Sequence, residues 1–321
     1  MATTAAPPAE PSAPPAAAPG PEPGRRHGVG RLAALLVSPT FLVLGLVVAY
    51  PLLDAIRLSF YQRDEGVNPQ TGLIGGGERF VGPENYAALF SSDQFLLAFR
   101  NTTTLTLSTV LIETVLGVAM ALIMNKAFAG RALIRASILI PWAIPTAISA
   151  LLWRWIYQAD GAANALLGTD ILWTTEGLQA WFAVVIADTW KTAPFIGLIV
   201  LAGLQIIPAE VYEAAKVDGA NAWSTFWHIT LPLVRPALIV AVLFRLLDVL
   251  RMFDLPYVMI GPGKQPVETL SILAFQEAIQ FTRFGPAAAM STLLFLYIAV
   301  VAFVFVKVLG ADVVGARVGR K

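Results

Sequence analysis

Residues 181–257 read WFAVVIADTWKTAPFIGLIVLAGLQIIPAEVYEAAKVDGANAWSTFWHITLPLVRPALIVAVLFRLLDVLRMFDLPY. Two apolar runs, 181–206 and 233–257, flank a polar segment at 206–232. A helix needs about 20 apolar residues to cross the roughly 30 Å of hydrocarbon in a bilayer, and both runs reach that length. We therefore predict two membrane-spanning helices joined by a polar connection outside the lipid.

The rest of the chain repeats this pattern. Further apolar runs of similar length lie at 32–53, 102–124, 136–157 and 284–306, which makes six candidate spans. None shows the two-residue alternation of a membrane β-strand. With 57% hydrophobic and 13% charged residues, the chain is more apolar than a soluble domain can bury. We predict an all-α integral membrane fold of six transmembrane helices, located in the cell (inner or plasma) membrane as a multi-pass protein.

Reactive and ionisable residues are too few or too scattered for several other functions. The formal net charge of +1 argues against a nucleic-acid partner. The chain has no cysteine and only two histidines, His27 and His228, so we predict no metal site and no catalytic residues. A membrane enzyme would need a cluster of nucleophile, base or metal ligands, and a secondary transporter would usually show internal repeats. The sequence has no obvious sign of either.

Composition divides the chain into four parts. Residues 1–30 are rich in proline and alanine without apolar periodicity, and we predict a disordered cytoplasmic tail. Residues 31–96 should form the first transmembrane helix and an outer loop; the apolar run is too long for a signal peptide, so we predict that it stays uncleaved. The transmembrane core is predicted at 97–309, and a short basic cytoplasmic tail at 310–321.

The basic residues predict the orientation. With the N-terminus inside, twelve of the 22 Lys and Arg residues fall in cytoplasmic segments, among them Arg131 and Lys216. The opposite side has few basic residues and many acids, such as Asp160 and Asp170. Because short cytoplasmic loops carry an excess of positive charge, we predict that both termini and the polar segment are cytoplasmic.

The polar segment has the signals of a helical hairpin. Pro208 and Glu210 suit the first turn of a helix, and Gly219 permits a sharp turn after it. A second short helix is predicted at 223–229, ending before Pro232. Such a hairpin exposes an apolar surface that a soluble partner could bind; the alternative is a hairpin that packs only against its own bundle.

The spacing within this segment is specific. Glu213-Ala214-Ala215, three residues, Gly219, nine residues, Ile229, one residue and Leu231-Pro232 resembles the EAA loop of permease subunits of binding-protein-dependent ABC importers at every signature position. Other segments, across nearly the whole membrane portion, are similar to maltose-type sugar permeases. They are Tyr50-Pro51, Leu58-Ser59-Phe60, Phe80-Val81-Gly82, Asn85-Tyr86, Asn101-Thr102, Ile140-Pro141-Trp142 with Pro145, residues 253–258, and Thr269-Leu270-Ser271.

A narrower resemblance concerns the cargo. Residues 188–195 and 243–245, with Asp248, are similar to actinobacterial trehalose permeases. The sequence departs from such relatives at Pro83 and at residues 261–264, both in predicted outer loops. The resemblance implies a type I importer permease that moves a sugar, such as trehalose or maltose, by alternating access; the alternative cargo is another polyol or glycerol phosphate.

The same resemblance implies a set of partners. These are a second permease subunit, two cytoplasmic ABC ATPase subunits, an extracellular or periplasmic solute-binding protein, the sugar and the lipid bilayer. The chain has no Gly-x-x-x-x-Gly-Lys-Ser/Thr loop, so we predict no cofactor in this chain, with ATP and Mg in the partner ATPase. The residues implied for coupling to that ATPase are Glu213, Ala214, Ala215, Asp218, Gly219, Ile229, Leu231 and Pro232.

Ionisable residues inside the spans predict the transport path, because hydrocarbon excludes them elsewhere. Three opposite-charge pairs at i,i+3 spacing lie in spans four and five, and Glu113 lies in span two. With aromatic faces, such charges could replace the water shell of a sugar. Alternatively, the pairs hold two permease subunits together. The candidate path residues are Trp142, Asp188, Trp190, Lys191, Arg245, Asp248 and Phe253.

Overall fold

The computed structural model describes residues 26–63, 77–126, 129–175 and 177–310. The chain divides into two compact units, one up to Leu53 and one from Asp54 onward. The first helix begins at Arg26, inside the predicted N-terminal tail. The rest of that tail lies outside the described residues, as does the predicted C-terminal tail from residue 311 on.

The first unit is a long apolar helix with a π-turn. It runs through α1 (Arg26–Leu44) and η2 (Gly45–Ala49) into α2 (Tyr50–Leu58), which extends into the second unit. In the π-turn the Tyr50 N–H donates to the Gly45 carbonyl. Pro51 follows, and its ring would clash with the carbonyl four residues earlier in a regular helix; the wider turn gives it room. The predicted first span therefore continues through Pro51.

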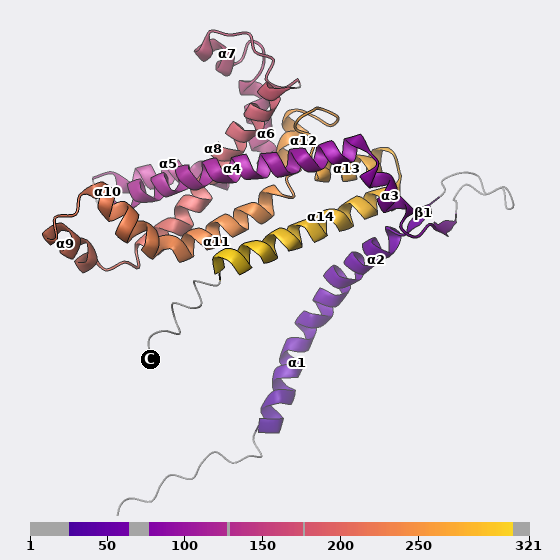
Figure 1. Cartoon of the computed structure of the whole chain (residues 1–321), viewed down its shortest axis with the longest axis horizontal. Helices are drawn as coiled ribbons and strands as arrows, with labels where there is room; N and C mark the ends of the chain where they lie inside the picture. The colour runs from indigo at the N-terminus through magenta and orange to yellow at the C-terminus, as the bar shows by residue number, and fades with distance from the viewer. Residues whose placement is uncertain (1–25, 64–76, 127–128, 176, 311–321) are drawn as a thin grey trace, which may run out of the picture. The chain divides into compact units, whose positions relative to one another are not determined.

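The second unit is mostly helical (Figure 1). Within its described residues, two strands pair antiparallel, with Gln62 opposite Arg79. The elements after α2 are β1 (Tyr61–Arg63), β2 (Glu78–Phe80), α3 (Glu84–Phe90), α4 (Asp93–Asn125), α5 (Arg131–Ala143), α6 (Thr146–Ile156), α7 (Ala162–Leu167), α8 (Leu178–Leu204), α9 (Ala209–Val217), α10 (Ala222–Thr225), η3 (Phe226–Thr230), α11 (Leu231–Val249), α12 (Asp254–Met259), α13 (Leu270–Phe275), η4 (Gln276–Gln280), α14 (Phe284–Phe305) and η5 (Val306–Gly310).

Among the described residues, five helices are long and apolar enough to cross a membrane. They correspond to the predicted first, second, fourth, fifth and sixth spans. The predicted third span, 136–157, is the pair α5 and α6, which are bent by 97°. With this pair counted as one span, the predicted all-α architecture of six spans is confirmed.

The bend arises at two prolines. Pro141 lies in the last turn of α5, and Pro145 is the N-cap of α6. Pro145 has no N–H and disfavours a helical conformation at the residue before it, and Ile144 is extended, with φ −74° and ψ 132°. The predicted span over 136–157 is therefore two helices joined at a sharp bend. Pro194, by contrast, lies inside a continuous α8.

The fifth span is shifted from its predicted bounds of 233–257. The helix already begins at Ala222 and ends at Val249. Residues 250–253 interrupt it, and the short helix α12 follows. The apolar run thus contains the end of one helix, a break and a second helix, which hydropathy alone does not separate.

Helices α4 and α8 pack closely through small residues. A Cβ added at Gly117 of α4 would lie 2.7 Å from the Ile196 side chain, and one added at Gly197 would lie 3.2 Å from the Gly117 carbonyl. Small residues let helix backbones approach closely inside membranes. Gly117 and Gly197 therefore determine the distance between the two helices.

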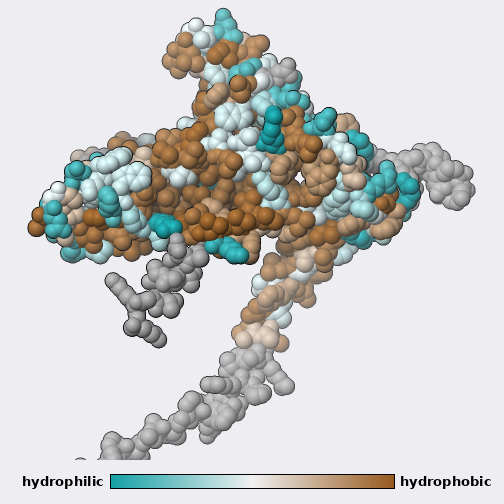
Figure 2. Space-filling view, in the orientation of Figure 1, coloured by the Kyte–Doolittle hydropathy of each residue, from teal (hydrophilic) through white to brown (hydrophobic). Residues whose placement is uncertain are grey.

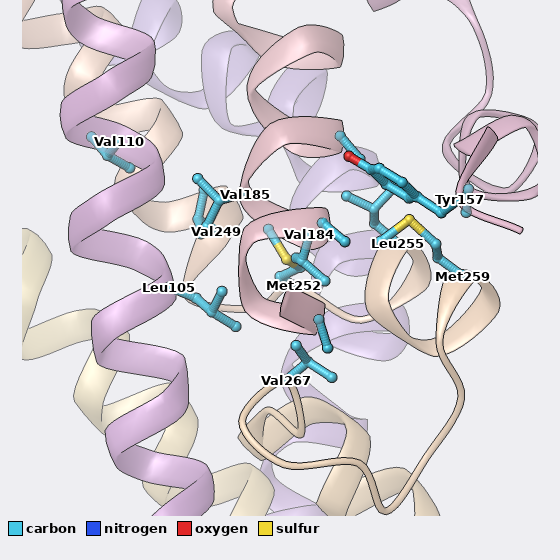
Figure 3. Packing of buried hydrophobic residues seen from close by; sticks show 14 residues of the cluster. Leu105, Val110, Tyr157, Val184, Val185, Val249, Met252, Leu255, Met259 and Val267 are labelled. Carbon is cyan, nitrogen blue, oxygen red and sulfur yellow. The ribbon is translucent and has the colours of Figure 1, made fainter. Parts of the chain in front are cut away.

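A buried hydrophobic cluster continues this contact. In Figure 3, Leu105 and Val110 of α4 lie beside Val184 and Val185 of α8, and Leu255 of α12 completes the cluster on its other side. The cluster connects α12 to the spans. It thereby positions the break at 250–253, which borders the cavity described below.

We expect a Gly117→Leu substitution to force α4 and α8 apart. Overpacking a tight contact costs about 1–3 kcal/mol, which should appear as a lower thermal unfolding temperature of the purified protein. Gly45→Leu is a matched control, because a Cβ at Gly45 has no atom within 4 Å. Equal unfolding temperatures for the two variants would contradict the predicted role of Gly117.

The segment after β2 explains part of the sequence resemblance. Asn85 donates from Nδ2 to the carbonyls of Ser59 and Tyr61 at 2.8 and 3.0 Å. The Tyr86 hydroxyl shares a 2.6 Å hydrogen bond with the Ser59 hydroxyl. A Cβ at Gly285 of α14 would lie 2.1 Å from the Tyr61 carbonyl. Asn85 and Tyr86 thus fix the β1 strand against the start of α14.

Much of the surface drawn in Figure 2 is hydrophobic. On α4, the side chains of Leu107, Leu111 and Val115 are between 62% and 67% exposed. Their spacing of four residues places them on one face of the helix. An exposed apolar stripe of this kind suits contact with lipid or with another membrane helix.

Candidate functional site

A buried arginine on α11 connects three helices. Arg245 donates from Nε to Glu113 of α4 at 2.7 Å, and from Nη2 to Glu113 and to Asp188 of α8, both at 2.9 Å. Its Nη1 donates to Asp248 on the same helix. The Thr192 hydroxyl donates to Glu113 as well. We refer to these five residues as the Arg245 cluster.

Burial differs sharply within this cluster. The side chains of Glu113, Arg245 and Asp188 are 0%, 3% and 8% exposed, whereas that of Asp248 is 55% exposed. Buried charges are tolerated where they are paired and hydrogen-bonded. Three hydrogen bonds of the guanidinium therefore go to the buried carboxylates of Glu113 and Asp188, and Asp248 is the most exposed charged member of the cluster.

A cavity of about 550 Å³ lies next to the cluster. Three acidic and three basic residues line it, so their formal charges cancel. The lining residues are Trp142, Thr146, Asp188, Lys191, Thr192, Phe195, Phe244, Arg245, Asp248, Val249, Arg251, Met252, Phe253, Asp254 and Leu255.

Six of the seven predicted path residues line this one cavity. They come from α5, α8, α11 and the break that follows α11, so that residues more than 100 positions apart meet at one place. They are Trp142, Asp188, Lys191, Arg245, Asp248 and Phe253.

Trp190 lies elsewhere. It lines a separate apolar groove between α4, α5 and α8, and its ring packs edge-on against Trp153 at 5.6 Å. One step along a helix turns a side chain by about 100°, so Trp190 faces away from the cavity that Lys191 lines. The predicted role of Trp190 in the path has no support from this geometry.

The predicted i,i+3 charge pairs form only in part. Arg245 pairs with Asp248 as expected. Arg251 lies 3.6 Å from Asp248 instead of pairing with Asp254. Lys191 donates to the Ile144 carbonyl at 2.9 Å, while Asp188 pairs with Arg245. For Asp188, a partner from another helix thus displaced the one on its own helix, because a buried carboxylate gains more from the guanidinium of Arg245 that reaches it from across the bundle.

An aromatic row lines part of the cavity wall. The ring of Trp142 stacks on that of Phe195, with centroids 6.0 Å apart, and Phe195 meets Phe244 edge-on at 6.5 Å. Trp142 is 44% exposed and Phe244 is 55% exposed. Phe253 stacks on Tyr257 at 4.8 Å near the break after α11. Flat apolar faces next to charged groups are the combination predicted from the sequence for replacing the water shell of a sugar.

A second candidate site is the coupling segment, α9 and the turn after it. The Gly219 N–H donates to the Lys216 carbonyl and the Ala220 N–H to the Ala215 carbonyl, at 3.1 and 2.9 Å. This is the Schellman pattern, and Gly219 has the left-handed φ of 77° that it requires. Gly219 therefore sets the turn, as predicted.

Most of the coupling segment faces outward. Glu213, Ala214, Asp218 and Gly219 are exposed, while Ala215 is buried at 5%. Within the described part of the chain, no hydrogen bond or ion pair reaches the Glu213 carboxylate. The segment thus leaves a charged group and a small residue exposed, whereas Ala215 packs on its own chain.

The second half of the hairpin is not a separate helix. Asn221 caps α10 by accepting from the Ser224 N–H at 2.8 Å, and the helix continues through η3 into α11. The prediction that it ends before Pro232 is wrong. The π-turn, in which the Leu231 N–H donates to the Phe226 carbonyl, precedes the proline as in the first unit and gives its ring room.

In consequence, Ile229 and Leu231 are half-buried at the start of the fifth span, and Pro232 is exposed. The turn after α9 therefore leads directly into the helix that carries Arg245.

Several residues of these two sites escaped the sequence analysis as site residues. Glu113 was recognised as a charge in a span but was not assigned to the path. Phe195 lies four residues after Lys191, and Phe244 directly precedes Arg245. Their closeness to charged residues within the spans could have identified them as cavity residues. Asn221 was readable as an N-cap three residues before Ser224.

Metal coordination has no candidate in the described residues. No group of three or more His, Cys, Asp or Glu side chains there could hold an ion. The two candidate sites are thus made from ion pairs, aromatic rings and exposed backbone turns.

Comparison with known proteins identifies the family. Residues 113–315 match the model of the binding-protein-dependent transport system inner membrane component. The chain belongs to this family. It is thus a permease of the inner membrane, and both candidate sites fall within the matched residues.

The family assignment extends to individual relatives. The chain is 36% identical to the trehalose transport system permease protein SugA of Mycobacterium tuberculosis, over 89% of this chain and 91% of the relative. It is 38% identical to the trehalose/maltose transport system permease protein MalF of Thermococcus litoralis, over 87% and 93%.

The fold also matches a solved structure. A bacterial ABC transporter involved in the import of the polysaccharide alginate superimposes with a TM-score of 0.74, at 22% identity, over 93% of this permease and 99% of that chain. The permease therefore has the type I ABC importer fold.

Proposed function

We propose that this permease imports an uncharged disaccharide, of the trehalose or maltose kind, through the cavity beside the Arg245 cluster. The observation that carries the proposal is the composition of that cavity: an aromatic row, an accessible carboxylate and formal charges that cancel. A disaccharide has many hydroxyls and no charge, so it gains from such a wall without unbalanced electrostatics. The names of the relatives SugA and MalF support the same cargo.

The alternative cargo, glycerol phosphate, fits less well. A phosphate dianion needs an excess of free cationic donors. Here the Arg245 guanidinium is bound by Glu113 and Asp188, and Asp248 lies within 3.6 Å of Arg251. Two of the three cations that line the cavity, Arg245 and Arg251, therefore already have anionic neighbours, and the third, Lys191, donates to the Ile144 carbonyl.

We propose that the energy for transport comes from a separate ATPase subunit. We infer that α9 and the turn at Gly219 bind a cytoplasmic ATPase subunit, with Glu213 as a charged contact, Ala214 allowing close approach and Asp218 beside the bend. The exposure of these residues supports this. Closure of the ATPase pair would then move the helix that begins at Ala222 and switch the cavity between outward-open and inward-open states.

The complete importer is proposed to contain four kinds of subunit. These are this permease, a second permease, two ATPase subunits that hold ATP and Mg, and a solute-binding protein on the outer side. Both termini of this chain are proposed to lie in the cytoplasm, in agreement with the basic residues near α9. Neither hydrolysis nor a cofactor is assigned to this chain.

The test is reconstitution of the complex in liposomes. ATPase activity is measured with the solute-binding protein and a panel containing trehalose, maltose, glucose and glycerol 3-phosphate. We expect a disaccharide to give the largest stimulation. Stimulation by glycerol 3-phosphate alone would overturn the proposed cargo, and the absence of uptake in the presence of ATP would overturn the proposed import.

Asp248 is expected to contribute directly to sugar transport. An Asp248→Asn variant keeps the shape of the side chain but loses a charged acceptor, whose hydrogen bonds are worth about 1.5–3 kcal/mol. We expect uptake to fall roughly tenfold or more, with little loss of thermal stability because Asn keeps an oxygen that accepts from Arg245, and Glu113 and Asp188 still pair with the guanidinium. Asp160→Asn, which is exposed and outside the cavity lining, is the control; equal uptake by both variants would contradict the role of Asp248.

A further inference from the structure

The break in the third span leaves a backbone carbonyl outside the helical ladder. The first hydrogen bond of α6 runs from the Ser149 N–H to the Pro145 carbonyl, one residue past Ile144. The Ile144 carbonyl accepts instead from the Lys191 ammonium of α8, at 2.9 Å. Non-helical backbone is tolerated at membrane depth only where protein or a wet cavity satisfies it. Lys191 thus supplies the donor that the break removes.

The lysine is available for this contact because its neighbours have other partners. Lys191 is 93% buried, since 7% of it is exposed, and Asp188, one turn earlier, is bound by Arg245 at 2.9 Å. No ion pair joins Lys191 to Asp188 within the described residues. The ammonium has three donors, and one of them is on Ile144 while the residue also lines the cavity.

The anchored carbonyl lies next to the aromatic row. Trp142 is two residues before Ile144 and stacks on Phe195, which is one helical turn after Lys191 on α8. Thr146, two residues after Ile144, also lines the cavity. The break is therefore attached to α8 at two points, the Lys191 hydrogen bond and the Trp142–Phe195 stack, and both border the space where a solute would bind.

We propose that Lys191 is a positioning residue for the sugar: it holds the break at Ile144, and with it Trp142, against α8 and so determines which sugars fit the cavity. The second part of this proposal, the choice of sugar, rests on the proposed function. The anchoring itself is a statement about the backbone and is independent of the cargo. A lysine that served only in a charge cluster would pair with Asp188, and the geometry points to the carbonyl instead.

The anchoring is tested by cysteine accessibility. The chain has no cysteine, so Thr146→Cys introduces a single thiol in the cavity wall next to the break. In the assembled complex, we expect Lys191→Met to change the labelling rate of this thiol by a charged methanethiosulfonate roughly tenfold, the factor of one charged hydrogen bond. Lys191→Arg, which keeps the donor, should restore most of the original rate.

A matched control and the selectivity measurement complete the test. Lys126→Met removes an exposed lysine and should leave the labelling rate unchanged. We also expect Lys191→Met to alter the ratio of trehalose to maltose uptake at least threefold, whereas a variant that only lowers the amount of complex reduces both rates equally.

The outcomes separate the two proposals. An unchanged labelling rate in Lys191→Met overturns the anchoring. A changed labelling rate with an unchanged uptake ratio overturns the role of Lys191 in sugar selection. If the wild-type complex takes up no sugar, the proposed function fails, and the labelling experiment still decides whether Lys191 holds the break.

Discussion

An Arg245→Met variant is expected to lose about 3–5 kcal/mol of folding free energy, the usual cost of removing one partner from a buried ion pair. The substitution leaves Glu113 and Asp188 buried without their cation, at 0% and 8% exposure. The loss should appear as a large drop in the thermal unfolding temperature of the purified complex, which is measured by tryptophan fluorescence. Uptake should be lost with it.

Two comparison variants show whether the loss of stability comes from buried carboxylates that are left without a cation. Adding Glu113→Gln to Arg245→Met removes one of the two buried negative charges, so it should recover part of the stability. Arg251→Met removes a cation that is 69% exposed and 3.6 Å from its partner, and exposed ion pairs contribute at most about 1 kcal/mol. If Arg245→Met and Arg251→Met unfold at the same temperature, the Arg245 cluster does not hold the three helices together.

A Gly219→Pro variant is expected to insert normally and to abolish uptake and stimulated ATPase activity. Proline holds φ near −65°, whereas the turn requires 77°, and it also lacks the N–H that donates to Lys216. The turn after α9 must then change its course. Because the turn is exposed, the membrane helices should keep their packing.

Graded substitutions at Gly219 separate conformation from bulk. A Cβ at this position has no atom within 4 Å, so Gly219→Ala should suffer only the left-handed strain of about 1–2 kcal/mol. Gly219→Asn should be closer to the wild type, because asparagine tolerates this conformation. Uptake in the order Gly, Asn, Ala, Pro is expected; normal uptake by the proline variant would contradict the coupling role.

Local signals in the sequence accounted for most of the fold. Apolar runs of sufficient length lie in all six spans, because crossing a bilayer is a requirement on each segment by itself. The turn at Gly219 was predicted for a similar reason, since its backbone conformation depends on the residue type at one position. The narrower failures were at helix boundaries. The fifth span starts and ends earlier than its apolar run, because hydropathy does not report where the backbone ladder is interrupted.

Local signals in the sequence did not predict which residues pair with each other in the candidate cavity. The sequence placed Asp188 and Lys191 on one face of a helix, which is correct, and that spacing suggested a mutual pair. In the folded chain Arg245 binds Asp188, and Lys191 turns to the Ile144 carbonyl. Both changes involve residues more than 40 positions apart, so no spacing rule within one helix could have predicted them.

The sequence by itself determined that this chain is an all-α membrane protein, that it has six apolar spans, and that a specific hairpin connects the fourth and fifth. These features follow from composition and from short-range spacing, which act along the chain. Only the tertiary structure decided that Glu113, Asp188 and Arg245 form one cluster, that six predicted path residues line one cavity, and that Trp190 does not. The physical reason is that a buried charge takes the partner that packing brings within hydrogen-bond distance.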